Sequence, residues 1–170
     1  CLGRLRSVIE KMKQNQGLLE QYDQVFADQL KSGIIELATD DDGLVNYLPH
    51  QPVITPHKAS TKLRVVFDGS AKTRSGKSLN NELFRGPVLL PDLGGILLRF
   101  RYFKFIVTAD VAKAFLQMEL APEDRNVTRF FWVKDIKKPP DGENLVTYRY
   151  KRVLFGVISS PFLLAAVLKL

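Results

Sequence analysis

The chain has 170 residues, 45% of them hydrophobic and 10% aromatic, which suits one globular domain with a buried core and excludes a disordered tail. Its formal charge of +7 at pH 7 favours a polyanionic partner, either a nucleic acid or an anionic membrane surface. The single cysteine excludes an internal disulfide and a cysteine-rich zinc site. No apolar run reaches the roughly 20 residues that span a bilayer.

Both ends of the chain look cut, because it starts at Cys1 without a methionine and stops at Leu170 inside an apolar run. We therefore expect a piece of a longer polypeptide. No signal peptide is visible, and one cysteine fits a reducing compartment. These features predict an intracellular protein, either cytoplasmic or nuclear.

The first 32 residues predict two helices. Apolar residues recur at intervals of three and four in 2–12 and again in 18–30, with Gly17 between them. Gly33 provides a stop for the second helix.

Short strands and turns are expected next. An acidic turn at 40–43 predicts a hairpin between strands at 34–37 and 44–48. The prolines that follow residue 48 mark an extended connector. The β-branched and aromatic run at 63–67 predicts another strand.

Basic residues concentrate between His57 and Lys77. This stretch contains six basic residues and a single acidic residue, Asp68. Two interpretations stay open: a solvated surface loop, or a loop that contacts phosphate groups. The six residues are Lys58, Lys62, Arg64, Lys72, Arg74 and Lys77.

One stretch has the pattern of a metal site. Over 103–109 apolar side chains alternate with the period of a strand, and Asp110 follows directly. A carboxylate just past a buried strand can hold a hard cation at the edge of a cleft, which suggests metal-assisted phosphoryl chemistry. The alternative is that Asp110 only caps the next turn, because aspartate is common there.

A helix at 91–100 is predicted before this strand, and two further strands at 128–133 and 145–152 follow it. A final helix begins at Ser160, with proline in its first turn. That helix is apolar almost all round and should need a partner surface. Helices that alternate with antiparallel strands predict an α+β architecture.

Four segments of the chain resemble the reverse transcriptase domain of the Bel-Pao group of LTR retrotransposons. They occur in the order of that group and at about its spacing, and the similarity covers most of residues 33–170. The segments are LPH at 48–50, LRVVFDGS at 63–70, SLNNEL at 78–83 with GP at 86–87, and FGVISSPF at 155–162.

The resemblance implies a right-hand polymerase fold, an α+β architecture of which this chain would hold a part. Residues 1–32 would be a helical lead-in, 33–102 the fingers, and 103–170 a partial palm. The chain would be truncated before the catalytic Asp-Asp hairpin of that family. The implied parent activity is RNA-directed DNA polymerisation, in which dNTPs are added to the 3′-hydroxyl of a primer.

The resemblance also implies a metal site. Asp110 would be the first catalytic aspartate and would bridge two Mg²⁺ ions, with Mn²⁺ as an alternative metal. Val111 would lend its backbone carbonyl to the ion on the nucleotide side. Two ions about 3.5–4 Å apart stabilise the attacking and leaving oxygens of an in-line displacement, so a bridging carboxylate suits this chemistry.

Five residues would contact the incoming nucleotide. Lys62 and Arg64 lie where fingers residues grip the triphosphate, and a guanidinium fork matches phosphate oxygens. Phe115 matches the aromatic gate under the sugar, although a plain core phenylalanine is the alternative. Phe155 and Gly156 lie where the base pair between template and nucleotide is shelved.

The implied partners are an RNA or DNA template–primer, dNTPs and the remainder of the polyprotein, comprising the rest of the palm, the thumb and RNase H. No membrane partner is expected. The family's Tyr-x-Asp-Asp hairpin has no counterpart here, so a two-ion site is incomplete and we expect the isolated fragment to be inactive. The alternatives are a catalytically inactive, basic nucleic-acid-binding module and an unstable relic.

Overall fold

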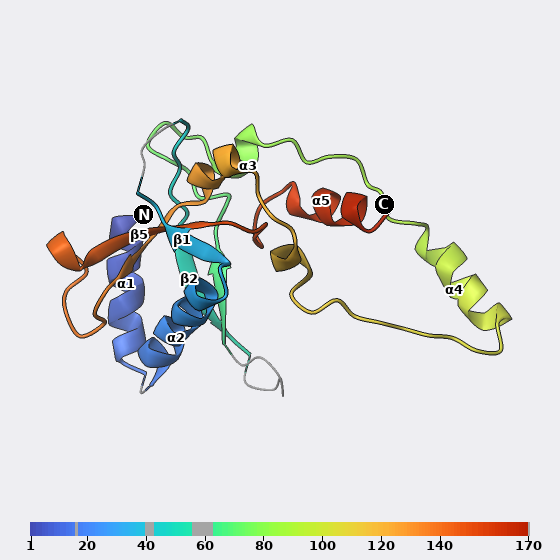
Figure 1. The fold of residues 1–170 in the computed structure, drawn as a ribbon, viewed down its shortest axis with the longest axis horizontal. Coiled ribbons are helices and arrows are strands. Elements are labelled where there is room, and N and C mark those ends of the chain that lie inside the picture. The colour runs from blue at the N-terminus through green and yellow to red at the C-terminus, as the bar shows by residue number, and fades with distance from the viewer. Residues whose placement is uncertain (16, 40–42, 56–62, 170) are drawn as a thin grey trace.

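The computed structural model of the chain describes residues 1–15, 17–39, 43–55 and 63–169. In it, two helices and two small sheets form a body from which a long arm extends (Figure 1). The arm carries one helix and returns to the body before the last strands are made. This mixture of helices and antiparallel strands agrees with the α+β prediction.

The two predicted N-terminal helices are confirmed as α1 (Leu2–Lys13) and α2 (Leu18–Lys31). Gly17 between them has a φ of 75°, a left-handed conformation that glycine adopts without strain. Each helix turns one apolar stripe towards the body. The buried residues of the two stripes are Leu5, Ile9, Met12, Leu19, Tyr22 and Phe26.

The larger sheet is antiparallel and has three strands in the order β1 (Ile35–Leu37), β5 (Leu145–Tyr150) and β4 (Phe130–Val133). The strands predicted at 128–133 and 145–152 are therefore confirmed as β4 and β5. The connection between them contains η3 (Gly142–Asn144), a short 3₁₀ helix.

The predicted hairpin between 34–37 and 44–48 is wrong. β1 pairs with the distant β5 instead, with Ile35 opposite Tyr150. This pairing wins because it leaves Ile35 only 1% and Tyr150 only 3% exposed, a burial that a two-stranded surface hairpin does not provide. The acidic residues 40–42 of the expected turn lie outside the described residues.

The segment expected as an extended connector contains a strand. β2 (His50–Ile54) pairs antiparallel with β3 (Leu63–Phe67), so the prediction of a strand at 63–67 is confirmed. Pro52 lies opposite Val65. Proline is tolerated here because a two-stranded sheet consists of edge strands, where one missing N–H donor costs little.

Aromatic rings from both sheets and from α2 form the core. His50 lies among them, 6% exposed, and the centroids of neighbouring rings in the cluster are 5.0–5.7 Å apart. Its Nδ1 lies 2.7 Å from the Tyr22 hydroxyl and its Nε2 lies 3.0 Å from the carbonyl of Phe131. The imidazole is thus satisfied within the core, and it does not present a free ligand. The rings of the cluster belong to Tyr22, Phe26, His50, Phe67, Phe130, Trp132 and Tyr150.

The arm begins after α3 (Leu79–Glu82) and contains α4 (Leu93–Tyr102), which confirms the helix predicted at 91–100. Asp92 caps α4, because its Oδ2 accepts a hydrogen bond from the N–H of Gly95. The arm returns to the body at η1 (Ala114–Gln117) (Figure 1).

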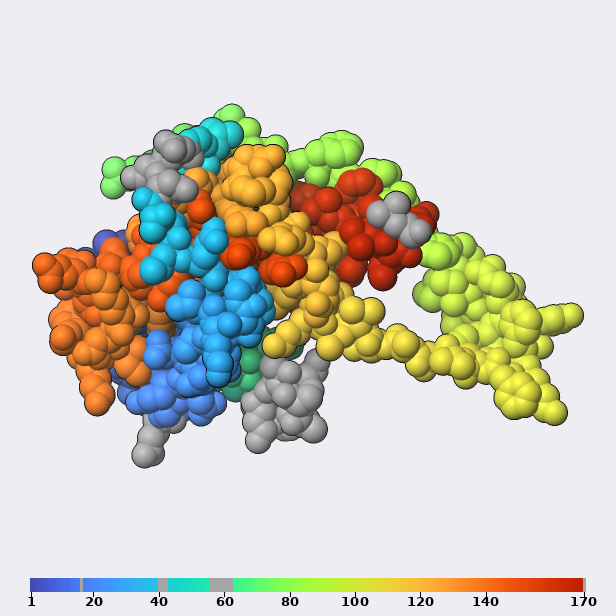
Figure 2. Space-filling view, in the orientation of Figure 1, coloured from blue at the N-terminus to red at the C-terminus, as the bar shows by residue number. Residues whose placement is uncertain are grey.

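The strand predicted at 103–109 is not formed. Phe105 is 83% and Val107 is 92% exposed, and this part of the arm runs as a narrow thread between α4 and the body (Figure 2). A strand needs a neighbour for its N–H and C=O groups, and no strand among the described residues lies beside it. Asp110 therefore does not follow a buried strand here.

The chain ends in α5 (Ser160–Val167), as predicted. Ser160 does not cap the helix with its side chain; its hydroxyl donates instead to the carbonyl of Leu154 at 2.8 Å. Gly86 of the arm packs so closely on Phe162 that a side chain at residue 86 would overlap the ring. None of the helices in the described ranges has the length and apolar character needed to cross a bilayer.

Candidate functional site

Three of the segments that carry the sequence resemblance meet in space, and Asn80 on α3 joins them. Its Nδ2 donates to the carbonyl of Gly156 at 3.0 Å and to the hydroxyl of Ser70 at 2.9 Å. Its Oδ1 accepts from the N–H of Ile158 at 2.9 Å, and its own N–H donates to the carbonyl of Gly69 at 2.9 Å. One amide side chain thus holds the loop after β5 against the end of β3.

Two glycines permit this contact. A Cβ on Gly69 would lie 2.6 Å from the carbonyl oxygen of Gly156. Gly156 has a φ of 92°, and a Cβ there would overlap the carbonyl of Phe67. Any side chain at either position would push the two segments apart. Glycine at 156 is therefore required by both conformation and space.

Phe115 and Phe155 form an aromatic pair beside this contact. Their ring centroids are 4.5 Å apart and their planes are nearly perpendicular. Residues 118–120 pair with 151–153, because Val153 N–H donates to the carbonyl of Met118 at 2.9 Å. This pairing brings η1 to the loop after β5. The structure therefore brings together three of the predicted nucleotide-contacting residues, Phe115, Phe155 and Gly156.

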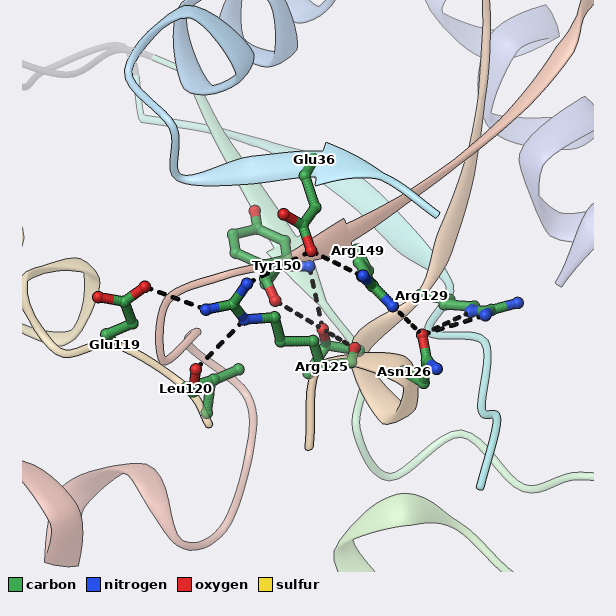
Figure 3. Close-up of polar contacts among 9 residues, drawn as sticks. Glu36, Glu119, Leu120, Arg125, Asn126, Arg129, Arg149 and Tyr150 are labelled. Atoms are coloured by element: carbon green, nitrogen blue, oxygen red, sulfur yellow. Dashed lines mark hydrogen bonds and ion pairs between the residues drawn. The ribbon is translucent and has the colours of Figure 1, made fainter. Parts of the chain in front are cut away.

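A polar network around Arg125 also contacts residues 119–120, which pair with the segment after β5 (Figure 3). Glu36 on β1 accepts from Arg149 Nε at 2.8 Å and lies 3.5 Å from Arg125 Nη1. Arg125 also donates to Glu119 Oε1 at 3.0 Å and to the carbonyl of Leu120 at 3.2 Å. The network therefore joins β1 and β5 to the segment that follows η1.

Arg125 belongs to η2 (Pro122–Thr128), and buried polar groups attach this 3₁₀ helix to β5. The hydroxyl of Thr128 donates to the carbonyl of Arg125 at 2.7 Å and accepts from the N–H of Tyr150 at 3.0 Å. The Oδ1 of Asn126 accepts from Arg149 Nη1 at 2.6 Å and from Arg129 Nη2 at 3.0 Å (Figure 3). Removing one member would leave a buried group unsatisfied, so the network fixes the backbone here.

Asp110 and Val111 lie on the exposed part of the arm, outside this contact. Val111 is 50% exposed. Across the described ranges, no three His, Cys, Asp or Glu side chains gather closely enough to hold a metal ion. Asp110 can offer one carboxylate, but the described residues do not by themselves fit a site for two ions.

Of the two predicted phosphate-contacting residues, the structure describes Arg64. Arg64 is exposed on β3, and its Nη2 lies 3.4 Å from the hydroxyl of Thr55. Lys62 lies outside the described residues, as does Lys58. In the rest of the basic segment, Lys77 forms an ion pair with Glu82 at 3.0 Å.

The structure adds two residues that the sequence did not single out, Asn80 and Arg125. Asn80 lies inside one of the resembling segments, so the motif pointed to its neighbourhood without giving its role. Arg125 lies in a stretch with no recognisable pattern, and its partner Glu36, which it shares with Arg149, is distant in sequence. Only the fold could identify it.

Among known proteins, the chain is similar to solved structures but matches no family model or curated sequence. Among solved structures, the chain is similar to a foamy viral protease-reverse transcriptase in complex with double-stranded DNA, with a TM-score of 0.58 and 21% identity over 86% of this chain and 22% of that one. It is also similar to the native protease-reverse transcriptase of Prototype Foamy Virus, with a TM-score of 0.54 and 21% identity over 86% of this chain and 16% of that one. The chain thus spans less than a quarter of either neighbour, and its fold is reverse-transcriptase-like.

Proposed function

We propose that this chain is part of an RNA-directed DNA polymerase of an LTR retrotransposon in the Bel-Pao group. Residues 33–102 would form the fingers and 103–170 a partial palm, with 1–32 as a helical lead-in. The reverse-transcriptase-like fold and the four resembling segments support this assignment. The whole enzyme would add dNTPs to a primer on an RNA or DNA template.

The observation that carries the proposal is the meeting of Gly69, Asn80 and Gly156 beside two aromatic rings. The hydrogen bonds from Asn80 to the loop after β5 join residues that are 76 and 78 positions apart in the sequence. All three segments that meet belong to the resembling motifs. Gly69 is buried in this contact, whereas Gly156 leaves an exposed surface without a side chain beside the paired rings of Phe155 and Phe115. Such a surface suits a flat base pair and its sugar.

Each predicted nucleotide-contacting residue has a proposed role. Phe155 and Gly156 shelve the base pair between template and incoming nucleotide. Phe115 lies under the sugar, where its rigid ring would clash with a ribose 2′-hydroxyl and pack against deoxyribose. Lys62 and Arg64 contact the triphosphate, Lys62 as a mobile point charge and Arg64 as a planar fork.

For the metal, we propose that Asp110 supplies one carboxylate and Val111 a backbone carbonyl to Mg²⁺, or to Mn²⁺ in its place. The ions would supply electrostatic stabilisation of phosphate oxygens during displacement. Further carboxylates would come from elsewhere in the polymerase, since no three His, Cys, Asp or Glu side chains of the described residues gather into a metal site. We therefore expect this chain alone to lack polymerase activity.

A primer-extension assay on the purified chain tests that expectation. We expect no synthesis with Mg²⁺ or Mn²⁺ on RNA or DNA templates. Synthesis that depends on Mg²⁺ and is abolished by Asp110→Asn would show that the chain contains a complete site, and would overturn the expectation of inactivity.

Nucleotide-dependent binding tests the assignment itself. We expect the chain to bind a labelled primer–template more tightly when Mg²⁺ and the complementary dNTP are added, and Phe115→Ala to remove that gain. Lys62→Ala with Arg64→Ala should remove it too, while Lys134→Ala with Lys137→Ala, in the connection between β4 and β5, serves as a control of equal charge. No response to the complementary dNTP would contradict the proposed nucleotide site.

A second candidate function is nucleic-acid binding without catalysis. The formal charge of +7 favours it, as does the exposed, unclustered Asp110 of the described chain. This module would bind nucleic acid with an affinity that falls steeply with salt and does not respond to dNTP or Mg²⁺. The titrations above therefore separate the two candidates. An unstable relic would instead fail to show a cooperative unfolding transition.

A further inference from the structure

The position of the Phe115 ring depends on the short antiparallel ladder between residues 118–120 and 151–153. Glu119 lies opposite Arg152 in this ladder. The N–H of Met118 donates to the carbonyl of Phe115 at 3.1 Å, so η1 leads directly into the ladder. In an antiparallel register, each step back from Glu119 is a step forward from Arg152. A slip of the ladder would therefore move Phe115 away from Phe155.

Arg125 fixes residues 119–120 from the side of β1. Its Nε donates to the carbonyl of Leu120 at 3.2 Å, and its Nη2 donates to Glu119 Oε1 at 3.0 Å. The third nitrogen, Nη1, lies 3.5 Å from Glu36 Oε1 (Figure 3). The Arg125 side chain is only 13% exposed, so its contacts are less screened by water than those of a surface ion pair. One planar guanidinium thus connects the ladder to a carboxylate of β1.

The carboxylate of Glu36 is held independently of Arg125. Glu36 Oε1 also accepts from Arg149 Nε on β5 at 2.8 Å. Loss of the Arg125 guanidinium would leave this second contact in place, but it would remove a donor from both Glu119 and the Leu120 carbonyl. The change should therefore release residues 119–120 while β1 and β5 stay paired.

We propose that Arg125 is a positioning residue of the nucleotide site. By fixing residues 119–120, it sets where the ring of Phe115 lies against Phe155, and with it the discrimination between deoxyribose and ribose. Arg125 acts through the backbone of the ladder and not by contact with the sugar. The discrimination rests on the proposed function, whereas the placement of the ring follows from the contacts above.

Fluorine NMR of the purified chain measures the ring contact when para-fluorophenylalanine replaces Phe155. This side chain is 55% exposed, so the added fluorine can be accommodated. Its resonance depends on the neighbouring ring, and Phe115→Leu gives the resonance of the unpaired state. Arg125→Gln should move the resonance at least half of the way to that state.

Arg149→Gln is the matched control. The Arg149 side chain is 14% exposed and contacts the same Glu36 oxygen, but it joins that carboxylate to β5. This variant should lower the urea midpoint as Arg125→Gln does, and should leave the fluorine resonance in place. An equal displacement of the resonance in both variants would overturn the proposal, because it would indicate general loosening. An unmoved resonance in folded Arg125→Gln would overturn it too.

Arg125→Lys decides the question if Arg125→Gln shows no cooperative urea transition. Lysine keeps a positive charge beside Glu36, but its ammonium is a point charge and lacks the planar fork that reaches three partners. The resonance should move in the same direction as for Phe115→Leu, over part of the distance. A resonance identical to that of the unaltered chain would refute the positioning role.

Sugar discrimination is measured by the gain in primer–template affinity when Mg²⁺ and the complementary nucleotide are added. Arg125→Gln should lower the ratio of the gain with dNTP to the gain with rNTP about fivefold or more, because a displaced ring no longer opposes the 2′-hydroxyl. An unchanged ratio beside a displaced resonance would overturn the link to the sugar. If the unaltered chain responds to neither nucleotide, the proposed nucleotide site fails and discrimination fails with it, whereas the fluorine resonance still decides whether Arg125 positions the ring.

Discussion

The body of the molecule buries its large apolar side chains, whereas the arm at 84–112 leaves its own exposed to solvent. In the body, Phe130 and Trp132 are 0% and 1% exposed, among rings from two sheets and α2. In the arm, Phe105 and Val107 remain 83% and 92% exposed (Figure 2). Both regions have clear apolar periodicity, so the contrast shows that a pattern is buried only where the described chain supplies a partner surface.

The largest expected effect comes from substitutions that compare these two regions directly. Phe130→Ala should lower the free energy of unfolding by about 3–5 kcal/mol, because it removes a buried ring and leaves a cavity. Phe105→Ala in the arm should change it by less than about 0.5 kcal/mol, as for other exposed positions. Urea unfolding of both variants measures the difference. Similar losses would show that the arm packs on the body in solution.

Acidification should lower the stability of the body, where His50 is buried, and should leave the arm unaffected. Burial of the imidazole lowers the pKa of His50 to about 4, from 6.5. The unfolded chain therefore takes up a proton first, so stability should fall as the pH drops from about 6.5 to 4, by about 3 kcal/mol in total. Urea midpoints across this range measure the loss.

His50→Gln provides the control for the acid response. This variant starts less stable but should lose much less free energy over the same pH interval, since its side chain does not titrate. If the slope of stability against pH were the same in both proteins, carboxylates and not His50 would be responsible.

Gly156 tests the contact that brings the resembling segments together. Gly156→Ala should cost about 2–3 kcal/mol, because a Cβ at a φ of 92° is strained and also overlaps the carbonyl of Phe67. Gly76→Ala is the matched control, with a φ of 83° and no heavy atom within 4 Å of the added Cβ, and should cost about 1 kcal/mol. Thermal unfolding compares the two. Equal costs would place the loop after β5 away from β3.

The smallest effect is expected in the extended segment at 103–109. Hydrogen exchange measures it directly at these residues. The backbone of this segment makes no strand pairing in the described structure, so its amides should exchange with solvent almost at the unprotected rate. Hydrogen exchange measured on peptides should show this beside strong protection in β5. Slow exchange at 103–109 would mean that the predicted strand forms in solution against a partner.

Local patterns predicted the elements whose partners are near or undemanding. The stripes of α1 and α2 follow from spacing and from Gly17, and α4 and α5 from their start signals. The resembling segments identified the neighbourhood of Gly69 and Gly156. Their order did not reveal that Asn80 joins them, because that depends on hydrogen bonds to residues 76 and 78 positions away.

The failed predictions have a common cause. The hairpin from β1 and the strand at 103–109 both have adequate strand sequences, but pairing is decided by which surface can satisfy the backbone and bury the side chains. β1 found β5 at long range. The segment at 103–109 found no neighbour among the described residues, and Asp110 remains exposed with it.

The amino-acid sequence by itself determined the α+β class, most of the helices, the basic character and the motifs of a reverse-transcriptase-like chain. Helical periodicity and turn residues act within a few positions, so they can be recognised without a fold. Only the tertiary structure decided which strands pair, that Phe115 lies against Phe155, and that Asn80 joins the loop after β5 to the end of β3. Those outcomes depend on burial and long-range hydrogen bonds, which are energies of the whole chain and not of any one segment.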